Sequence, residues 1–221
     1  MKLSVAIDGP AGAGKSTIAK LIAKRFQLTY INTGAMYRAI TYAAIKKDIS
    51  PESIEELCSM IDELTIEFKG ENLFLNDVDI TDDLCLPEIA QKVSLYASIP
   101  QIRKMLVKQQ QRIAEKIDVI MDGRDIGTVV LKDAPFKFYL TASAEKRADR
   151  RYRELQQKGI EVSYNKILHD IEERDYIDMN RDIDPLRKAA DAVEVDTSNM
   201  NIEEVVEKLS LIINSNLIHE I

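Results

Sequence analysis

The chain alternates short apolar runs with longer stretches in which apolar residues recur every three or four positions. Leu3–Asp8 is an apolar run that ends at a glycine, and Ser16–Phe26 has the spacing of a helix with one apolar face. Leu28–Asn32 has the pattern of a second strand, and Ala35–Ile45 that of an alanine-rich helix. A strand, a glycine loop, a helix and a strand form a βαβ unit, which predicts a parallel sheet.

The middle of the chain breaks this pattern. Within 64–83, three short strand-like segments are separated by turn residues at 69–72 and 76–77, which predicts a small antiparallel β insertion. The next pattern predicts helix from Pro87 to Lys116, with a break at Pro100. Further strands are expected at 118–122, 136–140 and 192–195, and further helices at 141–158, 163–174 and 202–213. The main fold is therefore predicted to be a parallel α/β sheet with helices on both faces.

The composition is typical of one acidic globular domain. Of the 221 residues, 45% are hydrophobic and 30% charged, and the formal net charge is −7. No apolar run approaches the ~20 residues that cross a bilayer, and the N-terminal run is too short for a signal peptide, so we expect a cytoplasmic protein without membrane contact. The negative charge argues against nucleic-acid binding. Cys58 and Cys85 are interpreted as inert thiols, and nothing in the sequence requires more than a monomer.

The strongest motif is GPAGAGKS at 9–16, which fits the phosphate-loop pattern G-x-x-x-x-G-K-[ST] at every fixed position. Its glycines allow backbone N–H groups to point at phosphate oxygens, Lys15 adds a positive charge, and the Ser16 hydroxyl can coordinate Mg²⁺. The loop also follows a predicted strand and opens a predicted helix. We therefore predict an ATP site formed by Gly9, Pro10, Ala11, Gly12, Ala13, Gly14, Lys15, Ser16 and Thr17.

An acidic residue follows another buried strand. The run Val119–Gly123 contains Asp122 at its end, where a carboxylate suits the outer shell of a Mg²⁺ ion. Apolar runs that end in aspartate are common, so the pattern is weak by itself. Beside a phosphate loop, it makes Asp122 and Ser16 the expected metal-site residues.

Arginines mark the expected acceptor side. An acceptor that is itself a phosphate ester needs cations beside ATP, and arginine binds phosphate bidentately while staying charged. Arg38, Arg124 and the segment 174–181 follow predicted strands or helix ends, where doubly wound sheets bind ligands. Surface ion pairs in an acidic protein are the alternative interpretation of each arginine.

One predicted helix carries several arginines. Arg147, Arg150 and Arg151 share a face of the helix at 141–158, so they repel one another unless an anion or acidic side chains lie opposite. Acidic residues on the same helix could neutralise them. The other interpretation is a mobile lid whose arginines close over the transferring phosphoryl group.

Four motifs occur together: IDGP with GAGKS at 7–16, TGAMYR at 33–38, DGRDIGTVV at 122–130, and the 174–181 segment that ends in Asn-Arg. Together they resemble the bacterial cytidylate kinases, a branch of the P-loop nucleoside monophosphate kinases, nearly end to end. The family often has Asp-Ser-Gly where this chain has Asn32-Thr33-Gly34. Thr33 keeps the hydroxyl, whereas no role is carried over to Asn32.

The resemblance implies a P-loop NTPase-type fold that transfers a phosphoryl group from ATP to CMP or dCMP with Mg²⁺. It implies one kinase domain whose core is 1–35, 117–145 and 185–221, with a monophosphate-binding lobe at about 36–116, the β insertion at about 64–83 and a helical lid at about 146–184. The catalytic residues it implies are Lys15, Arg124, Arg150, Arg151 and Arg181. The substrate-binding residues it implies are Arg38, Arg124, Arg174 and Arg181 at the CMP phosphate, Ser94, Arg103 and Asp125 at cytosine, with Thr33 nearby, and Asp178 at the pentose.

Asp125 also predicts the choice of base on chemical grounds. Cytosine carries an amino donor at C4, for which a carboxylate is an acceptor, whereas uracil carries a carbonyl there. A buried acceptor–acceptor mismatch costs about 1–3 kcal/mol, so CMP and dCMP are expected over UMP by roughly tenfold to hundredfold.

Two other functions fit a phosphate loop. A P-loop kinase for another small acceptor, such as UMP or AMP, would share most of these features. A nucleotide-regulated switch selective for GTP would carry an N-K-x-D motif after a strand, and the sequence has none.

Overall fold

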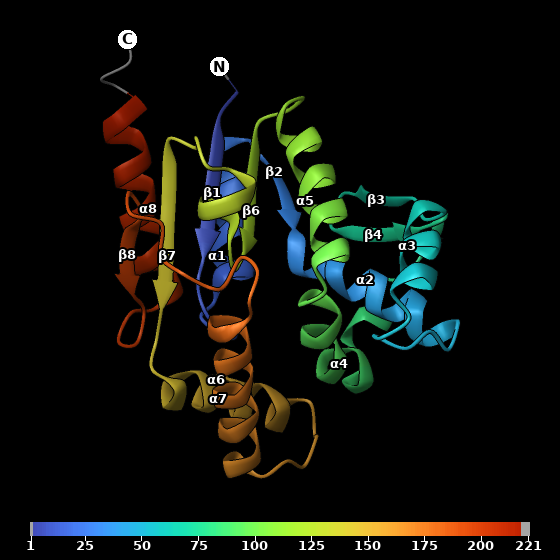
Figure 1. Cartoon of the computed structure of the whole chain (residues 1–221). Coiled ribbons are helices and arrows are strands. Elements are labelled where there is room, and N and C mark those ends of the chain that lie inside the picture. The colour runs from blue at the N-terminus through green and yellow to red at the C-terminus, as the bar shows by residue number, and fades with distance from the viewer. Residues whose placement is uncertain (1, 218–221) are drawn as a thin grey trace.

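The computed structural model describes residues 2–217 and contains a central sheet of five parallel strands in the order β2-β6-β1-β7-β8 (Figure 1). The strands are β1 (Ser4–Asp8), β2 (Thr29–Asn32), β6 (Val119–Gly123), β7 (Phe136–Thr141) and β8 (Val193–Asp196). In register, Asp8 lies opposite Gly123, and Asn32 lies opposite Asp122. The chemistry-bearing ends of three strands therefore meet at one edge of the sheet.

Helices surround this sheet, and a smaller lobe lies beside it. The helices beside the sheet are α1 (Lys15–Phe26), α2 (Thr33–Lys46) and α8 (Ile202–Leu217). Helices α6 (Ala144–Gln157) and α7 (Tyr164–Asn180) pack against each other beyond the ends of the strands. The lobe contains α3 (Ile54–Asp62), α4 (Pro87–Ala97), α5 (Pro100–Ala114) and an antiparallel sheet of β3 (Ile66–Lys69), β4 (Asn72–Leu75) and β5 (Val78–Asp79). The arrows of β1, β7 and β8 point toward the pair α6 and α7 (Figure 1).

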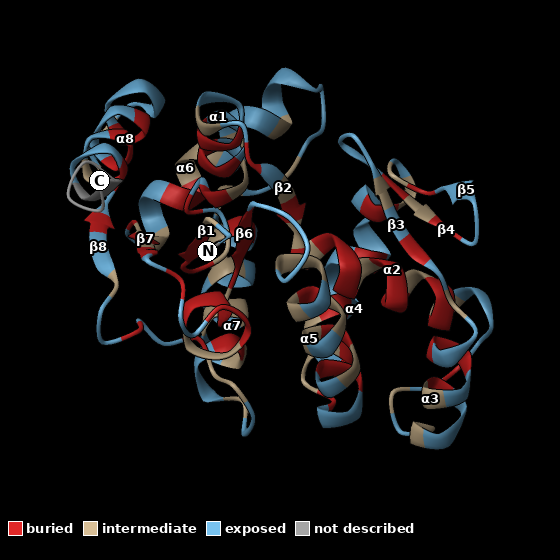
Figure 2. Cartoon of the chain, turned by 90° about the horizontal axis from the view of Figure 1, so that it is seen from above, coloured by how far each residue is buried: buried red, intermediate tan, exposed pale blue. Residues whose placement is uncertain are grey.

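The two faces of the sheet enter two apolar clusters. Val5 and Ile7 pack with residues of α1 and α8, whereas Ala6, between them on β1, packs with residues of α2 and α5. This is the alternation that a strand imposes on successive side chains. Figure 2 shows the buried residues concentrated in the inner strands and on the inward sides of the helices. The predicted fold, a parallel sheet covered on both faces plus a small antiparallel sheet, is confirmed.

The antiparallel insertion forms at the predicted turn. Asn76 and Asp77 join β4 to β5 with φ values of 48° and 64°, both in the left-handed region that a two-residue hairpin of type I′ requires. Asparagine and aspartate tolerate this conformation better than other non-glycine residues do, so the local sequence selects the turn.

Three helix predictions were incomplete or wrong. Helix α3 was not predicted, although Leu57, Met60 and Ile61 have helical spacing and are buried. Helix α7 continues to Asn180 instead of ending at residue 174, because its last turns lack an apolar stripe and face the polar site. Helix α6 begins at Ala144, after β7 and an N-cap at Ser143 whose hydroxyl accepts the Lys146 N–H, and not at residue 141.

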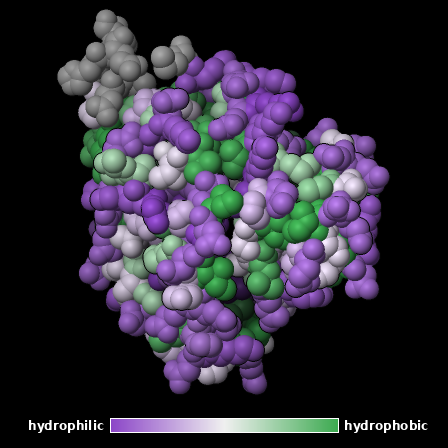
Figure 3. All heavy atoms as spheres, viewed as in Figure 1, coloured by the Kyte–Doolittle hydropathy of each residue, from purple (hydrophilic) through white to green (hydrophobic). Residues whose placement is uncertain are grey.

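The surface is predominantly polar on the face seen in Figure 3, where hydrophobic residues gather only in patches. Among residues 2–217, no helix combines the length and the apolar character needed to cross a bilayer.

Candidate active site

The predicted phosphate loop connects β1 to α1. Gly9, Gly12 and Gly14 have φ values of 146°, 75° and 85°. A Cβ atom on Gly9 would lie 1.9 Å from the carbonyl oxygen of Leu140, so this position has no room for a side chain. The repeated left-handed conformations curve the loop in the way that phosphate-binding nests of backbone N–H groups require. The glycine pattern seen in the sequence therefore has a steric and a conformational cause.

Lys15 is folded back onto its own loop. Its side chain is buried, and Nζ donates to the carbonyl oxygen of Pro10 at 2.7 Å. Burial, together with the positive charge of Arg124, lowers the Lys15 pKa well below its ordinary value. A phosphate near Nζ would relieve this unfavourable state.

The two predicted metal-site residues lie in direct contact. Ser16 Oγ donates to Asp122 Oδ2 at 2.8 Å, and the Tyr30 hydroxyl donates to Asp122 Oδ1 at 2.8 Å. A hydroxyl and a carboxylate are hard oxygen ligands of the kind Mg²⁺ prefers. In the described part of the chain, no group of three or more His, Cys, Asp or Glu side chains could hold a metal ion. The pair fits a Mg²⁺ ion that takes its other ligands from nucleotide phosphates and water.

A pocket between α2, α4 and α7 contains every predicted substrate-binding residue except Arg38. Its wall is formed by Thr33, Gly34, Tyr37, Val93, Ser94, Ala97, Arg103, Gly123, Arg124, Asp125, Arg174, Asp178 and Arg181. These residues come from four separate segments of the chain, and the fold brings them together at the strand ends beside the phosphate loop. We call this the arginine pocket.

One end of the arginine pocket has an excess of positive charge. Arg124 Nε donates to Asp178 Oδ2 at 2.7 Å, but the Nε of Arg174 is buried without a hydrogen-bond partner. Burial and then the charge of Arg124 lower the pKa of Arg174 to about 10, and the same two causes lower the pKa of Arg38. Although burial acts to raise it, Arg124 and Arg174 hold the pKa of Asp178 below its ordinary value. The three guanidiniums therefore lie close enough to interact, and among them only Arg124 donates to a carboxylate.

The other end is built around the buried carboxylate of Asp125. It accepts hydrogen bonds from Nη2 of Arg103 and, at 3.3 Å, from Nη2 of Arg181. Arg103 also donates from Nη1 to the Ala97 carbonyl at 3.2 Å. Burial raises the pKa of Asp125 even though both guanidiniums oppose the change. This end pairs donors and an acceptor, as recognition of a polar base edge requires.

Asp8 links the two halves of the site, and sequence reasoning missed it. Its carboxylate accepts the backbone N–H groups of Ile126 and Gly127, both at 2.7 Å. Burial raises the Asp8 pKa to about 7, against the opposing effect of these two N–H donors. The end of β1, which begins the phosphate loop, thereby holds the turn that follows Arg124 and Asp125.

The three arginines of the helix predicted to form a lid have different partners. Arg147, which was not among the predicted site residues, donates to the Ala11 carbonyl at 2.9 Å and to Asp175 Oδ2 at 2.5 Å. Arg150 donates to the Thr197 carbonyl, just after β8. Arg151 pairs with Glu154, and its side chain is 51% exposed. The signal for Arg147 was its place on the same helical face as the other two.

Two further residues near the pocket had no predicted role. The Asn32 side chain accepts the Ala35 N–H at 2.9 Å and caps the N-terminus of α2, a role that needs no charge. The Tyr37 hydroxyl is buried without a partner, and the Arg103 guanidinium lies 5.6 Å from its ring centre. Tyr37 thus offers an unused polar group on the pocket wall.

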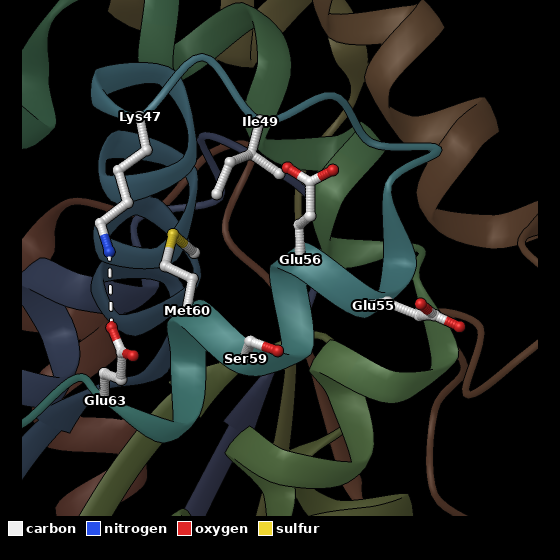
Figure 4. A pocket seen from close by; sticks show the side chains of 7 residues that line it. All are labelled: Lys47, Ile49, Glu55, Glu56, Ser59, Met60 and Glu63. Atoms are coloured by element: carbon white, nitrogen blue, oxygen red, sulfur yellow. Dashed lines mark ion pairs between the residues drawn. The ribbon is translucent and has the colours of Figure 1, made fainter.

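A second hollow, of about 430 Å³, has different chemistry (Figure 4). It lies over α3 and the segment after α2, where Glu55, Glu56 and Glu63 point their carboxylates toward the hollow or the solvent around it. Lys47 is paired with Glu63 at 3.7 Å. A site this acidic repels phosphates, so the arginine pocket is the candidate for an anionic substrate.

Comparison with known proteins shows the family to which this sequence belongs. Residues 5–215 match the family model described as Cytidylate kinase. A cytidylate kinase from Clostridium tetani is 55% identical over 220 residues, which cover 100% of this chain and 97% of that protein. Another from Clostridium acetobutylicum is 58% identical over 207 residues, or 94% of this chain and 95% of that protein. The chain belongs to the cytidylate kinase family.

Membership in this family makes the chain a nucleoside monophosphate kinase and supports ATP as its phosphoryl donor. A solved shikimate kinase from Bacteroides thetaiotaomicron is also similar, with a TM-score of 0.50, 14% sequence identity, and coverage of 96% of this chain and 98% of that one. At this identity the likeness concerns the fold alone, which cytidylate kinases share with kinases that act on other substrates.

Proposed function

We propose that this protein transfers the γ-phosphoryl group of ATP to the 5′-phosphate of CMP or dCMP, giving ADP and CDP or dCDP. The observation that carries the proposal is the cluster of Arg38, Arg124 and Arg174 beside the phosphate loop, with Arg174 Nε unpaired. A dianionic phosphate would give these guanidiniums an anionic hydrogen-bond partner.

The base end of the arginine pocket supports cytosine as the acceptor base. The Asp125 carboxylate would accept the C4 amino group, while Arg103 and Ser94 would donate to the N3 and O2 acceptors of the ring. Asp178 would accept a hydroxyl of the pentose. UMP would place its C4 carbonyl against Asp125, and this mismatch lowers its kcat/KM by roughly tenfold to hundredfold.

The acceptor phosphate is already an anion, so the reaction needs no strong general base. Lys15 would leave the Pro10 carbonyl and bind the transferring phosphoryl group, and Arg124, Arg150 and Arg151 would add positive charge around it. Arg181 would join them only after leaving its bonds to Asp125 and Asp184. Mg²⁺, held through Ser16 and Asp122, would neutralise charge on the ATP phosphates. Each of these groups acts by position and charge.

We further propose that the lobe at about 36–116 and the lid at about 146–184 close on the bound substrates and exclude water. Arg150 and Arg151 would then move from Thr197 and Glu154 toward the phosphates.

The test is a coupled ADP-release assay with ATP and Mg²⁺ across CMP, dCMP, UMP, AMP and GMP. We expect CMP and dCMP to exceed UMP in kcat/KM by at least roughly tenfold. Equal turnover of UMP would reject the assignment of Asp125. If none of the five acceptors raises the rate of ADP release above the rate measured without acceptor, the proposed function is rejected.

A further inference from the structure

Asp184 lies immediately beyond α7, outside every motif that pointed to the site. Its φ of 49° lies in the left-handed region, which aspartate tolerates better than most side chains. This conformation allows one residue to present both its side chain and its carbonyl to the arginine pocket. The two groups have different partners.

The carboxylate and the carbonyl of Asp184 each hold one guanidinium. Asp184 Oδ2 accepts from Arg103 Nε at 3.1 Å, and the Asp184 carbonyl accepts from Arg181 Nε at 2.8 Å. The same two arginines donate to Asp125 from their Nη2 atoms. Two arginines and two aspartates thus form a closed ring, in which each aspartate contacts both arginines.

The ring fixes the orientation of Arg103. Its guanidinium, 1% exposed, donates to Asp184 from Nε, to the Ala97 carbonyl from Nη1 and to Asp125 from Nη2. Arginine has five N–H donors in a rigid plane, so these bonds leave one N–H on each Nη atom. Those two donors suit the adjacent N3 and O2 acceptors of cytosine, provided that the plane does not rotate.

Asp184 also balances the charge of the ring. Without its carboxylate, the two guanidiniums would rely mainly on Asp125, with Asp178 as a further counter-charge for Arg181. They would then be drawn more closely to the carboxylate that must accept the cytosine amino group. The carboxylate of Asp184 is 27% exposed, so its removal affects the pocket without leaving a large buried void.

We propose that Asp184 is a specificity-determining positioning residue, which holds Arg103 so that Arg103 and Asp125 together recognise cytosine. The inference rests on the proposed function. Asp184 touches no reacting atom, so its loss should raise the KM for CMP and lower base selectivity while kcat changes little.

The experiment compares Asp184→Ala and Asp184→Asn with the wild type and with Asp182→Asn. Asp182 is exposed, lies two positions away and undergoes the same loss of charge. For each protein, kcat and KM are measured with CMP and UMP, CMP affinity is measured by calorimetry, and the melting temperature is recorded.

We expect Asp184→Ala to raise the CMP KM roughly tenfold and to lower the CMP:UMP ratio of kcat/KM by a similar factor, with kcat within about twofold. Asp184→Asn keeps an oxygen acceptor for Arg103 Nε, so it should recover part of the selectivity. Asp182→Asn should behave as the wild type.

A fall in melting temperature with an unchanged CMP:UMP ratio would assign Asp184 a structural role only and overturn the inference. If Asp184→Ala does not fold, Asp184→Asn decides by the same ratio. If the wild type prefers CMP to UMP and the Asp184 variants keep the same preference, the inference about Asp184 is rejected and the proposed function stands. Wild-type protein that does not phosphorylate CMP rejects the proposed function.

Discussion

The phosphate loop and the arginine pocket are neighbours, but they are prepared for their ligands in different ways. In the loop, polar groups already have internal partners: Lys15 is bonded to Pro10, Ser16 to Asp122, and the Ala11 carbonyl to Arg147. In the pocket, the Arg174 Nε and the Tyr37 hydroxyl are buried with no partner at all.

The difference predicts how each side binds. The donor side must exchange internal hydrogen bonds for contacts with ATP. Breaking these bonds reduces the net free energy of ATP binding. At the phosphate end of the acceptor side, the Arg174 Nε gains a partner without giving up a hydrogen bond, because it has none in the free protein. At the base end, Asp125 is already bonded to Arg103 and Arg181. The donor loop is therefore closed on itself, whereas the acceptor pocket is electrostatically poised for phosphate.

The largest effect should come from Lys15→Ala on the donor side. The substitution removes the positive charge at the transferring phosphoryl group, so kcat should fall by roughly 10³-fold. CMP affinity, measured by calorimetry without ATP, should stay close to that of the wild type because Lys15 is not in the arginine pocket. Loss of CMP binding would contradict the separation of the two sides.

The next effect should come from Arg174→Met on the acceptor side. Losing a bidentate phosphate contact should lower kcat/KM for CMP by roughly 10²-fold, with little change in the KM for ATP. The same variant should raise stability without CMP by about 1 kcal/mol, because methionine removes the repulsion with Arg124 and the buried Nε that has no hydrogen-bond partner. Steady-state kinetics and urea unfolding measure the two quantities.

The matched control for that variant is Arg187→Met, at an exposed arginine nearby in the sequence. It should change neither kinetics nor stability. A loss of stability in Arg174→Met would show that the Arg174 guanidinium is satisfied in the free protein, which would contradict the role given to its unpaired Nε.

Asp125→Asn should act on base choice. Asparagine can present an amino group to the C4 carbonyl of uracil, so the CMP:UMP ratio of kcat/KM should fall by roughly tenfold or more. An unchanged ratio in the acceptor assay would remove Asp125 from the base-recognition end of the pocket.

The last prediction concerns stability and not activity, and it involves Asp8, which connects the two sides. Burial raises its pKa to about 7 in the folded chain, above the ordinary value of an aspartate. The folded state therefore binds a proton more readily, and the contribution of Asp8 to stability is greatest at low pH and declines up to about pH 7. The free energy of unfolding of the wild type, relative to Asp8→Asn, should fall by up to about 1.4 kcal/mol per pH unit between roughly pH 5 and 7 and then level off. A difference that rises with pH would contradict the sign of this shift.

Much of the fold could be predicted because the apolar pattern repeats with clear periods. Val5 and Ile7 on one face of β1, and Ala6 on the other, produce the continuous apolar run of a strand buried on both sides. Helix α7 was predicted too short because Arg174, Asp178 and Arg181 interrupt any apolar stripe there. Those residues follow the requirements of the site, which conflict with the pattern of a buried helix.

The site could be predicted only where residue types carry chemistry within a motif. The phosphate loop and the arginines of TGAMYR and DGRD belong to such motifs. Asp8 resembles any aspartate at a strand end, and Asp184 belongs to no motif, so their roles depend on contacts with residues 118 and 81 positions away. The sequence places Arg147, Arg150 and Arg151 on one helical face and cannot distinguish their roles. Their partners differ in the structure: Arg147 donates to Ala11, Arg150 donates to Thr197, and Arg151 is half-exposed.

The central claim is that the arginine pocket holds the phosphate acceptor. The most direct measurement is a crystal structure of the protein with CMP and without ATP. The account predicts the CMP phosphate within hydrogen-bond distance of Arg38, Arg124 and Arg174, with the cytosine amino group on Asp125. A CMP molecule bound elsewhere, with Arg174 Nε still unpaired, would contradict it.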